Sequence, residues 1–230
     1  MTILELLARG EISVKGRLPR SSNRTFLVEV AQATQTALAV YKPGPGERPL
    51  WDFPPGLYQR ELAAYLLSDA LGWGLVPPTI VRDGPAGEGS LQLFVDADVE
   101  QHYFTLREEI GHHERLKLIC AFDLVANNAD RKSGHCLLGR EGRIWAIDNG
   151  LSFHAEPKLR TVIWDFAGEP IPRPIVGAVR RLVKAGLPEG LAKLLDPDER
   201  DALLARARTL MSEARFPADA SGHRYPWPLV

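Results

Sequence analysis

The chain has 230 residues, of which 45% are hydrophobic and 25% are charged, and its formal net charge is −1. This length is sufficient for a hydrophobic core in one domain or in two small lobes. The near-neutral charge does not favour general binding to nucleic acid or to anionic membranes. No run of about 18 apolar residues predicts a transmembrane helix, and the first residues lack the pattern of a signal peptide. The two cysteines, Cys120 and Cys136, have no metal-binding spacing, so we expect reduced thiols in a cytoplasmic protein.

The N-terminal part of the sequence predicts mainly strands. Three β-branched or alternating runs are separated by polar turn clusters, namely EISVKGRLP, RTFLVEVA and TALAVYKP. A Pro- and Gly-rich loop follows, and LYQRELAAYLLSDALG then predicts an amphipathic helix that ends at Gly72. Two more strands surround a Gly-rich turn in PPTIVRD and GSLQLFVDAD. We therefore expect an N-terminal lobe over residues 1–95, with five strands and one helix.

The remaining sequence predicts mainly helices, after a linker over residues 96–103. The segment TLREEIGHHERLKLICAFDLVANN has apolar residues at positions 118, 122 and 125, which predicts one buried helix face. A short hairpin follows in HCLLG and RIWAID, and further helices are expected near residues 174–186 and 196–214. The Pro-rich tail is expected to lie extended along the surface. The sequence therefore predicts an α+β protein with two lobes, the second being helical over residues 104–230.

Four charged residues stand at the ends of these elements in an order that suits phosphoryl transfer from ATP. Lys42 ends the third strand, Glu61 lies in the next helix, Asp130 follows the central helix, and Asp148 follows the hairpin. This reaction depends mostly on positioning and on neutralising the charge of the phosphate oxygens. The lysine can bind the phosphates and the glutamate can hold the lysine in place. One aspartate can orient or deprotonate a hydroxyl, while the other can bind Mg²⁺, which prefers oxygen ligands.

The segment NNADRKSGH, followed by AIDNG, resembles the catalytic and metal-binding loops of the phosphatidylinositol 3- and 4-kinase family. The family pattern is Asp-Arg with Asn four positions after the Arg, then a tripeptide similar to Asp-Phe-Gly. The whole chain resembles a small actinobacterial family related to these kinases, over residues 12–155 in element order. The resemblance implies a two-lobed protein-kinase-like fold with ATP in the cleft. It also implies transfer of the γ-phosphate to a hydroxyl of an acceptor that the sequence does not identify.

The resemblance assigns roles to individual residues. Lys42 would bind the phosphates, with Glu61 as its partner, and Asp148 would bind the metal. Asp130 would be the catalytic aspartate, accompanied in its loop by Asn128 and Arg131. The remaining nucleotide contacts would come from the phosphate-covering loop, at Ser21 and Ser22, and from the backbone of the adenine-binding hinge, at Phe94 and Val95.

The sequence departs from the family pattern in its metal-binding segments and beyond Asp148. His135 stands where the family has a metal-binding asparagine, and Asn149 replaces the phenylalanine of the tripeptide. Imidazole is better suited to Mn²⁺ than to Mg²⁺, so we expect Asp148 and His135 to bind Mg²⁺ or Mn²⁺, with a neutral imidazole whose ordinary pKa is near 6.5. The basic run that binds phosphoinositides is absent after Asp148, so lipid specificity is the weakest implication of the resemblance, and the acceptor could be a protein, a lipid or a small molecule.

Other interpretations of these residues remain open. Asp130 and Arg131 could form only an ion pair that ties loops together. His112 and His113, beside Glu114, could indicate a metal site, although a solvated helix face is the better prediction. The protein could be a pseudokinase that binds nucleotide and regulates a partner protein, or an enzyme of the same fold that transfers AMP.

Overall fold

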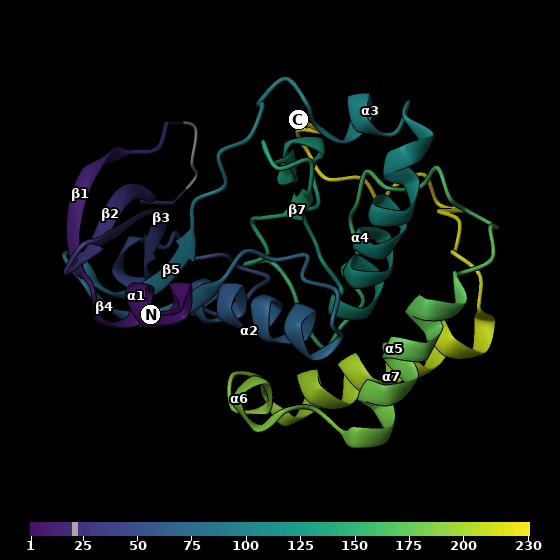
Figure 1. Cartoon of the computed structure of the whole chain (residues 1–230). Coiled ribbons are helices and arrows are strands. Elements are labelled where there is room, and N and C mark those ends of the chain that lie inside the picture. The colour runs from purple at the N-terminus through teal and green to yellow at the C-terminus, as the bar shows by residue number, and fades with distance from the viewer. Residues whose placement is uncertain (20–22) are drawn as a thin grey trace.

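The computed structural model describes residues 1–19 and 23–230 of the chain. Figure 1 shows a sheet-rich N-terminal part beside a larger, mainly helical part. The structure therefore confirms the predicted α+β class, with a strand-rich lobe and a helical lobe. Ser21 and Ser22, which the resemblance assigns to the phosphate-covering loop, lie outside the described residues.

The strand-rich lobe contains one antiparallel sheet of five strands in the order β1-β2-β3-β5-β4. Its strands are β1 (Glu11–Arg17), β2 (Phe26–Gln32), β3 (Gln35–Pro43), β4 (Thr79–Gly84) and β5 (Gly87–Leu93). The central strand β3 pairs with β2 on one side and with β5 on the other, and its register places Lys42 opposite Ser90. Lys42 therefore projects from a strand in the middle of the sheet, which is a rigid support for a functional side chain.

A short helix that the sequence analysis did not predict covers this sheet. Helix α1 (Ile3–Arg9) begins at a capping box, in which Thr2 and Glu5 satisfy each other's backbone N–H groups. Leu6 and Leu7 of α1 are buried in the core of the sheet. The expectation of a single helix in the N-terminal part is therefore wrong. The capping box is visible in the sequence, but the segment is too short for helical periodicity to indicate it.

The predicted helix of the N-terminal part is α2 (Leu57–Ala70), which follows the short 3₁₀ helix η1 (Gly44–Gly46). Figure 1 shows α2 running from the sheet toward the helical part. Its buried face, which includes Ala63, Ala64 and Leu67, belongs to the same apolar core as the C-terminal helices. Helix α2 therefore connects the two parts of the molecule and can bring Glu61 to the boundary between them.

The helical part is built around α4 (His113–Ala126), which is predominantly apolar and deeply buried. Phe122 and Val125, two of the residues that predict the buried face of this helix, are completely buried. The other elements are α3 (Tyr103–Leu106), η2 (Ile110–His112), η3 (Ser133–His135), β6 (Cys136–Leu138), β7 (Ile144–Ala146), α5 (Arg173–Ala185), α6 (Glu189–Ala192) and α7 (Pro197–Glu213). The long helix expected before Asn127 is divided into α3, η2 and α4, with Gly111 at the break.

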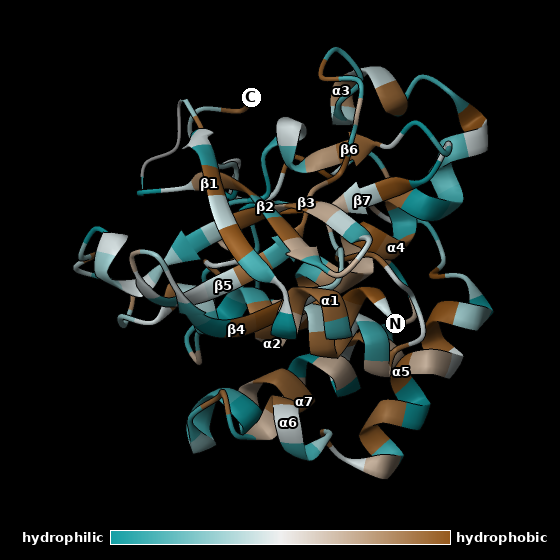
Figure 2. Ribbon diagram, turned by 60° about the vertical axis from the view of Figure 1, so that its left-hand side comes forward, coloured by the Kyte–Doolittle hydropathy of each residue, from teal (hydrophilic) through white to brown (hydrophobic). Residues whose placement is uncertain are grey.

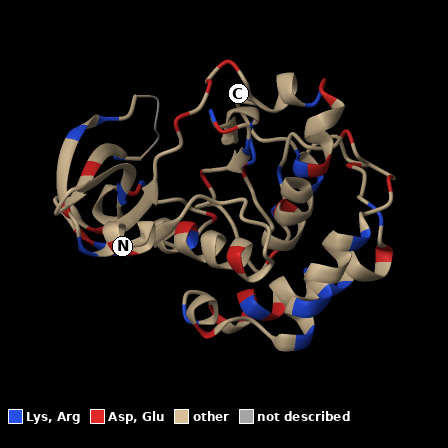
Figure 3. Ribbon diagram, in the orientation of Figure 1, with Lys and Arg blue, Asp and Glu red and all other residues tan. Residues whose placement is uncertain are grey.

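Helix α5 is amphipathic, and Figure 2 shows alternating hydrophobic and hydrophilic patches along it. Ile175, Val179 and Leu182 are buried at helical spacing. The opposite face is basic, and Figure 3 shows Lys and Arg gathered along α5 and α7. On α5, the exposed cations of this face are Arg173, Arg180, Arg181 and Lys184.

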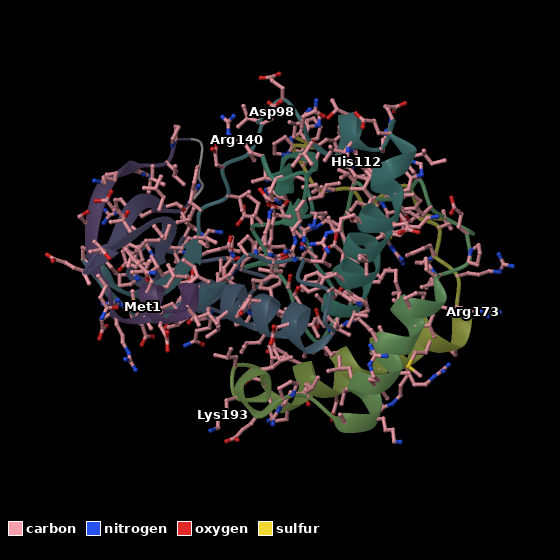
Figure 4. All side chains as sticks on the ribbon, in the orientation of Figure 1. Met1, Asp98, His112, Arg140, Arg173 and Lys193 are labelled. Atoms are coloured by element: carbon pink, nitrogen blue, oxygen red, sulfur yellow. The ribbon has the colours of Figure 1, made fainter. Side chains whose placement is uncertain are left out.

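The segment between the sheet and the helical part is attached to the β6–β7 hairpin. The Arg140 guanidinium lies 2.7 Å from an Asp96 carboxylate oxygen, and the Asp98 N–H donates to the Leu138 carbonyl at 3.3 Å. Figure 4 accordingly places the labelled Asp98 and Arg140 side by side. The division of the chain into lobes at residues 96–103 stays a prediction.

The C-terminal tail after α7 contains no helix and no named strand, and it contacts the segment that follows α4. The Ser133 N–H donates to the Leu229 carbonyl at 2.8 Å, and the Thr161 N–H donates to the Arg224 carbonyl at 3.0 Å.

Across residues 1–19 and 23–230, no helix has both the length and the apolar character that crossing a membrane requires.

Candidate active site

Lys42 lies at the centre of an ion-pair cluster between the two lobes. Its ammonium group bonds to the Glu61 carboxylate on α2 and lies 2.8 Å from Oδ1 of Asp148. Burial tends to lower the pKa of the Lys42 ammonium, but the nearby Asp148 and Glu61 carboxylates outweigh this effect and raise the pKa above its ordinary value. Lys42 is therefore a fixed positive charge at neutral pH.

Glu61 joins three elements of the structure. Its side chain is only 3% exposed. One oxygen accepts from Lys42, and the other accepts from the Asn149 N–H at 3.0 Å. The next residue in the chain, Arg60, is also buried and donates to the Ser152 carbonyl and to Glu199 of α7. These contacts hold α2 against the segment after β7, so the Lys42–Glu61 pair has a defined position.

Asp148 projects from the segment directly after β7. Its backbone has a φ of 55°, a left-handed conformation that is uncommon for residues other than glycine and is found at functional sites. Its side chain is 51% exposed, with Oδ2 at 3.4 Å from Nε2 of His135. The positive charge of Lys42 is the main reason that the pKa of Asp148 is lowered. Asp148 is therefore an ionised, accessible carboxylate.

His135 is oriented by the backbone of the neighbouring loop. Its Nδ1 lies 2.9 Å from the Asp130 carbonyl, so the neutral ring donates from Nδ1 and directs the lone pair of Nε2 toward Asp148. Burial lowers the pKa of His135 to about 4. The pKa is thus shifted below the ordinary value near 6.5, because the side chain is only 14% exposed and its charged form is poorly solvated.

The donor set of His135 and Asp148 fits a divalent cation. An imidazole nitrogen with a free lone pair faces an ionised carboxylate, and a carbonyl orients the other ring nitrogen, as is usual for metal-bound histidines. Elsewhere, His112 pairs with Glu109 on the outer side of the helical part, where Figure 4 labels it. Over the described part of the chain, no group of three or more His, Cys, Asp or Glu side chains is arranged to hold a metal.

Asp130 lies in the loop after α4 and is partly exposed. Its carboxylate is 24% exposed and lies 3.1 Å from the Lys132 ammonium. Its backbone N–H donates to Oδ1 of Asn128 at 2.9 Å. Burial raises the pKa of Asp130, although Lys132 counteracts part of the change. The raised pKa makes this carboxylate a better proton acceptor than an ordinary aspartate.

Arg131 is completely buried, in contrast to its neighbour Asp130. Its guanidinium makes a bidentate pair with Asp123 of α4, with distances of 2.9–3.1 Å. It also donates to the Ile147 carbonyl at 2.7 Å and to Oδ1 of Asn149 at 2.6 Å. These contacts connect the loop after α4 with the segment that carries Asp148. A group with no exposed surface cannot touch an acceptor, so the expected catalytic role of Arg131 is wrong.

Asn128 is also buried; its side-chain oxygen accepts from the Asp130 N–H, and its backbone bonds to Asp123 and Arg160. It therefore positions the loop and does not face a substrate, which corrects the expectation of a catalytic role. The residues predicted for the site do not include Asp123, and Asn149 is predicted only as a departure from the family pattern. Asp123 could have been found, because it is a charged residue on an otherwise apolar helix face, eight residues before Arg131.

The hinge residues Phe94 and Val95 follow β5. The Phe94 N–H donates to the Leu38 carbonyl of β3 at 3.0 Å, so it is not available to adenine. The Val95 N–H has no hydrogen-bond partner among residues 1–19 and 23–230. Of the two expected hinge residues, Val95 is therefore the one with a free backbone donor.

No known protein-family profile matches the chain. Protein Rv2133c from Mycobacterium tuberculosis (strain ATCC 25618 / H37Rv) is 42% identical over 261 aligned positions, which cover 97% of this chain and 94% of that protein. The chain belongs to the family of protein Rv2133c.

Three solved structures show the fold of this family. Hydra Fam20 with sugar has a TM-score of 0.59 at 15% identity and covers 92% of this chain and 87% of its own. The Golgi casein kinase with Mn/ADP bound also has a TM-score of 0.59 at 15% identity, with coverages of 99% and 80%. The Helicobacter pylori proinflammatory kinase CtkA has a TM-score of 0.51 at 11% identity, with coverages of 90% and 93%. The fold is therefore kinase-like, while the narrower relation to phosphatidylinositol kinases stays a prediction.

Proposed function

We propose that the protein is an ATP-dependent phosphotransferase that moves the γ-phosphate of ATP to a hydroxyl of its acceptor. The observation that carries this proposal is the position of Lys42, which bridges Glu61 of α2 and Asp148 of the segment after β7. Three elements that are distant in the sequence thus converge on one cation between the lobes. The kinase-like fold, and the Mn/ADP bound to the Golgi casein kinase, support the proposal.

Each side chain has a role that follows from its surroundings. Lys42 binds the phosphates of ATP, and Glu61 fixes the position of the lysine. Asp148 and His135 hold Mg²⁺ or Mn²⁺, which neutralises charge on the phosphate oxygens when it is bound. Asp130 accepts the proton of the acceptor hydroxyl, because its carboxylate is accessible and its pKa is raised by burial.

The cleft would hold the adenine through the backbone of the segment after β5. The free N–H of Val95 is the donor that supports this placement. Ser21 and Ser22 remain the proposed phosphate-covering residues. We also propose a cytoplasmic location, which is supported by the two buried free cysteines. The alternative function, a pseudokinase, would require a partner protein that it regulates.

Mass spectrometry and nucleotide binding test the proposed function. The purified protein is incubated with ATP and Mg²⁺ or Mn²⁺, and the products and any modified protein are identified. Release of ADP or a gain of phosphate supports phosphotransfer, whereas a gain of AMP shows AMP transfer. Binding of ATP without any turnover, with all candidate acceptors, indicates a pseudokinase.

The variant Asp148→Asn tests the metal site directly. It keeps the shape of the side chain but removes the charge that offsets the cation, so metal-dependent ATP binding should fall at least tenfold with an unchanged circular dichroism spectrum. Asp201→Asn, which alters an exposed aspartate on α7, is the matched control and should bind ATP normally. Unchanged metal-dependent binding by Asp148→Asn would remove Asp148 from the site.

A further inference from the structure

A hollow of about 460 Å³ lies on the surface between two segments that both contact the loop carrying Asp130. One wall is formed by residues 51–54, in the loop before α2, and the other by His154, Glu156 and Lys158, after Asp148. Nothing in the proposed phosphotransfer site described above uses these residues. Both of its walls nevertheless contact residues that directly precede Asp130, namely Ala129 and Asn127.

The first wall is attached to the catalytic loop through Phe53. This side chain is buried in a small apolar cluster with Leu57, Ala129 and Leu151. Ala129 immediately precedes Asp130 in the chain. The residues that surround Phe53 therefore stand directly beside the loop that would receive an acceptor hydroxyl.

The second wall is attached to the same loop by hydrogen bonds. The Asn127 side-chain amide donates to the carbonyls of His154 and Glu156, at 2.8 and 2.7 Å. Further along, the Arg160 N–H donates to the Asn128 carbonyl at 2.9 Å. Both walls thus have fixed positions relative to Asp130, which is what a site for an acceptor requires.

Trp51 projects from the first wall into solvent, with 97% of its surface exposed. The loop that carries it is closed at its base by Glu47, whose carboxylate accepts from the N–H groups of Gly56 and Tyr58 at 3.0 and 2.6 Å. The loop is therefore anchored on both sides of Trp51. A tryptophan normally buries a large apolar area, so a nearly complete exposure on an anchored loop indicates a surface for a ligand.

The polar groups of the hollow suit a neutral ligand with several hydroxyls. Asp52 and Glu156 offer carboxylate oxygens, and Lys158 lies between them at 3.8 and 3.7 Å. These distances are long for ion pairs, so the three groups can bond to a ligand without breaking tight contacts. Carboxylates accept from hydroxyls and the ammonium donates to them. The excess of one negative charge disfavours a phosphorylated or otherwise anionic ligand.

We propose that this hollow binds an uncharged saccharide, so that the acceptor of the phosphotransferase is a sugar hydroxyl. The indole of Trp51 packs against the C–H face of the sugar ring, while Asp52, Glu156 and Lys158 bond to its hydroxyls. One further hydroxyl of the bound sugar then points to Asp130. This inference rests on the proposed function, because it names the acceptor class for that same site.

In the proposed reaction, the γ-phosphate of ATP is transferred to a hydroxyl of the bound sugar. The oxygen of the sugar hydroxyl forms a bond to the γ-phosphorus of ATP, and the bond from that phosphorus to the β,γ-bridging oxygen breaks. ADP leaves, and the hydroxyl proton passes to the Asp130 carboxylate. The products are ADP and a sugar phosphate ester, and Asp130 later releases its proton to water.

The test uses the full chain and three variants. Wild-type protein is incubated with ATP, Mg²⁺ or Mn²⁺ and a panel of neutral sugars at millimolar concentration, namely glucose, galactose, xylose, N-acetylglucosamine and common disaccharides. ADP release is measured, and the product is identified by mass spectrometry. Trp51→Ala and Asp52→Asn should each raise the KM for the sugar at least tenfold and leave the affinity for ATP unchanged. Ile110→Ala, which removes an apolar side chain that is 84% exposed elsewhere, should change neither value.

The outcomes separate this inference from the proposed function. A phosphorylated sugar from the wild-type protein, with the variant effects above, supports the saccharide site. ATP binding with phosphate transfer to a serine peptide or to a lipid vesicle, and to none of the sugars, overturns the saccharide site but keeps the phosphotransferase. A Trp51→Ala variant with an unchanged KM for the sugar also overturns it. Absence of metal-dependent ATP binding in the wild-type protein overturns the proposed function itself.

Discussion

Asp130 and Arg131 are adjacent in the chain, yet their surroundings are opposite. Arg131 has no exposed surface and pairs with Asp123, whose side chain is 1% exposed. Asp130 is partly exposed, and Asp148, its counterpart across the site, is 51% exposed. The buried cluster satisfies its charges within the protein. The open cluster leaves carboxylate oxygens accessible, so the same short sequence supplies both a structural anchor and a reactive group.

The buried Asp123–Arg131 pair mainly fixes the positions of neighbouring residues and adds little to the free energy of unfolding. Desolvation raises the pKa of Asp123, and the bidentate contact with Arg131 offsets only part of this effect. Such a pair contributes little compared with apolar residues of the same volume, because both charges lose their water. Its value lies in the bonds from Arg131 to the Ile147 carbonyl and to Asn149, which set the position of Asp148 between them.

The largest effect is expected from removing one member of the buried pair. Arg131→Met leaves the Asp123 carboxylate buried without a partner, so the free energy of unfolding should fall by about 3–5 kcal/mol. The double variant Asp123→Leu with Arg131→Met should regain a large part of this loss. Urea unfolding followed by circular dichroism measures both values.

The neighbouring Lys132→Met is the matched control for this experiment. It breaks the Lys132–Asp130 contact, in which both side chains are more than a fifth exposed, and should change stability by less than about 1 kcal/mol. If Arg131→Met were no less stable than Lys132→Met, the distinction between a buried anchor and an open cluster would fail.

The open cluster should respond to substitution in activity and not in stability. Asp130→Asn removes the proton acceptor but keeps the side-chain volume, so turnover should fall by about 10²–10⁴-fold. ATP affinity should stay the same, because the proposed partner of Asp130 is the acceptor hydroxyl, and so the loss should appear in kcat. The comparison requires kcat, ATP affinity and unfolding curves for the variant and the wild type. A variant with normal kcat but weak ATP binding would show that Asp130 contacts the nucleotide instead.

The sequence predicts the open cluster better than the buried one. Lys42 and Glu61 lie in, and Asp130 and Asp148 follow, strands and helices that periodicity and turn residues indicate, and the order of the four along the chain suggests that they meet. Their exposure does not follow from the sequence, because it depends on how α2 and the segment after β7 pack. Asp123 stands out as a charge on an apolar helix face, but its pairing with Arg131 does not follow from the sequence, since no local pattern shows that two residues eight positions apart face each other across a loop.

Two other differences between the predictions and the structure have identifiable physical causes. Helix α1 was missed because seven residues are too few for periodicity, although its capping box was available as a signal. The lowered pKa of His135 could not be foreseen, because it results from burial beneath elements that are remote in the sequence. The fold class was predictable from the strand and helix patterns alone, whereas burial of individual polar groups required the tertiary structure.

A third polar contact, between Tyr103 and Asp165, is intermediate in burial, because it joins a buried hydroxyl to a partly exposed carboxylate. The Tyr103 side chain is fully buried and its hydroxyl donates to the Asp165 carboxylate, which is itself 41% exposed and also lies 3.1 Å from Arg107. Burial and the neighbouring Asp165 charge raise the pKa of Tyr103 far above its ordinary value. In the unfolded chain the same phenol ionises near its ordinary pKa of about 10.

This contact predicts a loss of stability in alkali. Above pH 10 the unfolded chain releases the Tyr103 proton while the folded chain retains it, so the folded state binds more protons and unfolding becomes easier as the pH rises. One pH unit above the unfolded pKa, the contribution is roughly 1.4 kcal/mol. Tyr103→Phe removes this titration, so its stability should decrease less between pH 9 and pH 11 than that of the wild type. Tyr225→Phe, which alters an exposed tyrosine, should follow the wild type. Parallel curves for wild type and Tyr103→Phe would mean that the Tyr103 hydroxyl is reached by water, and that its contact belongs with the open cluster and not with the buried one.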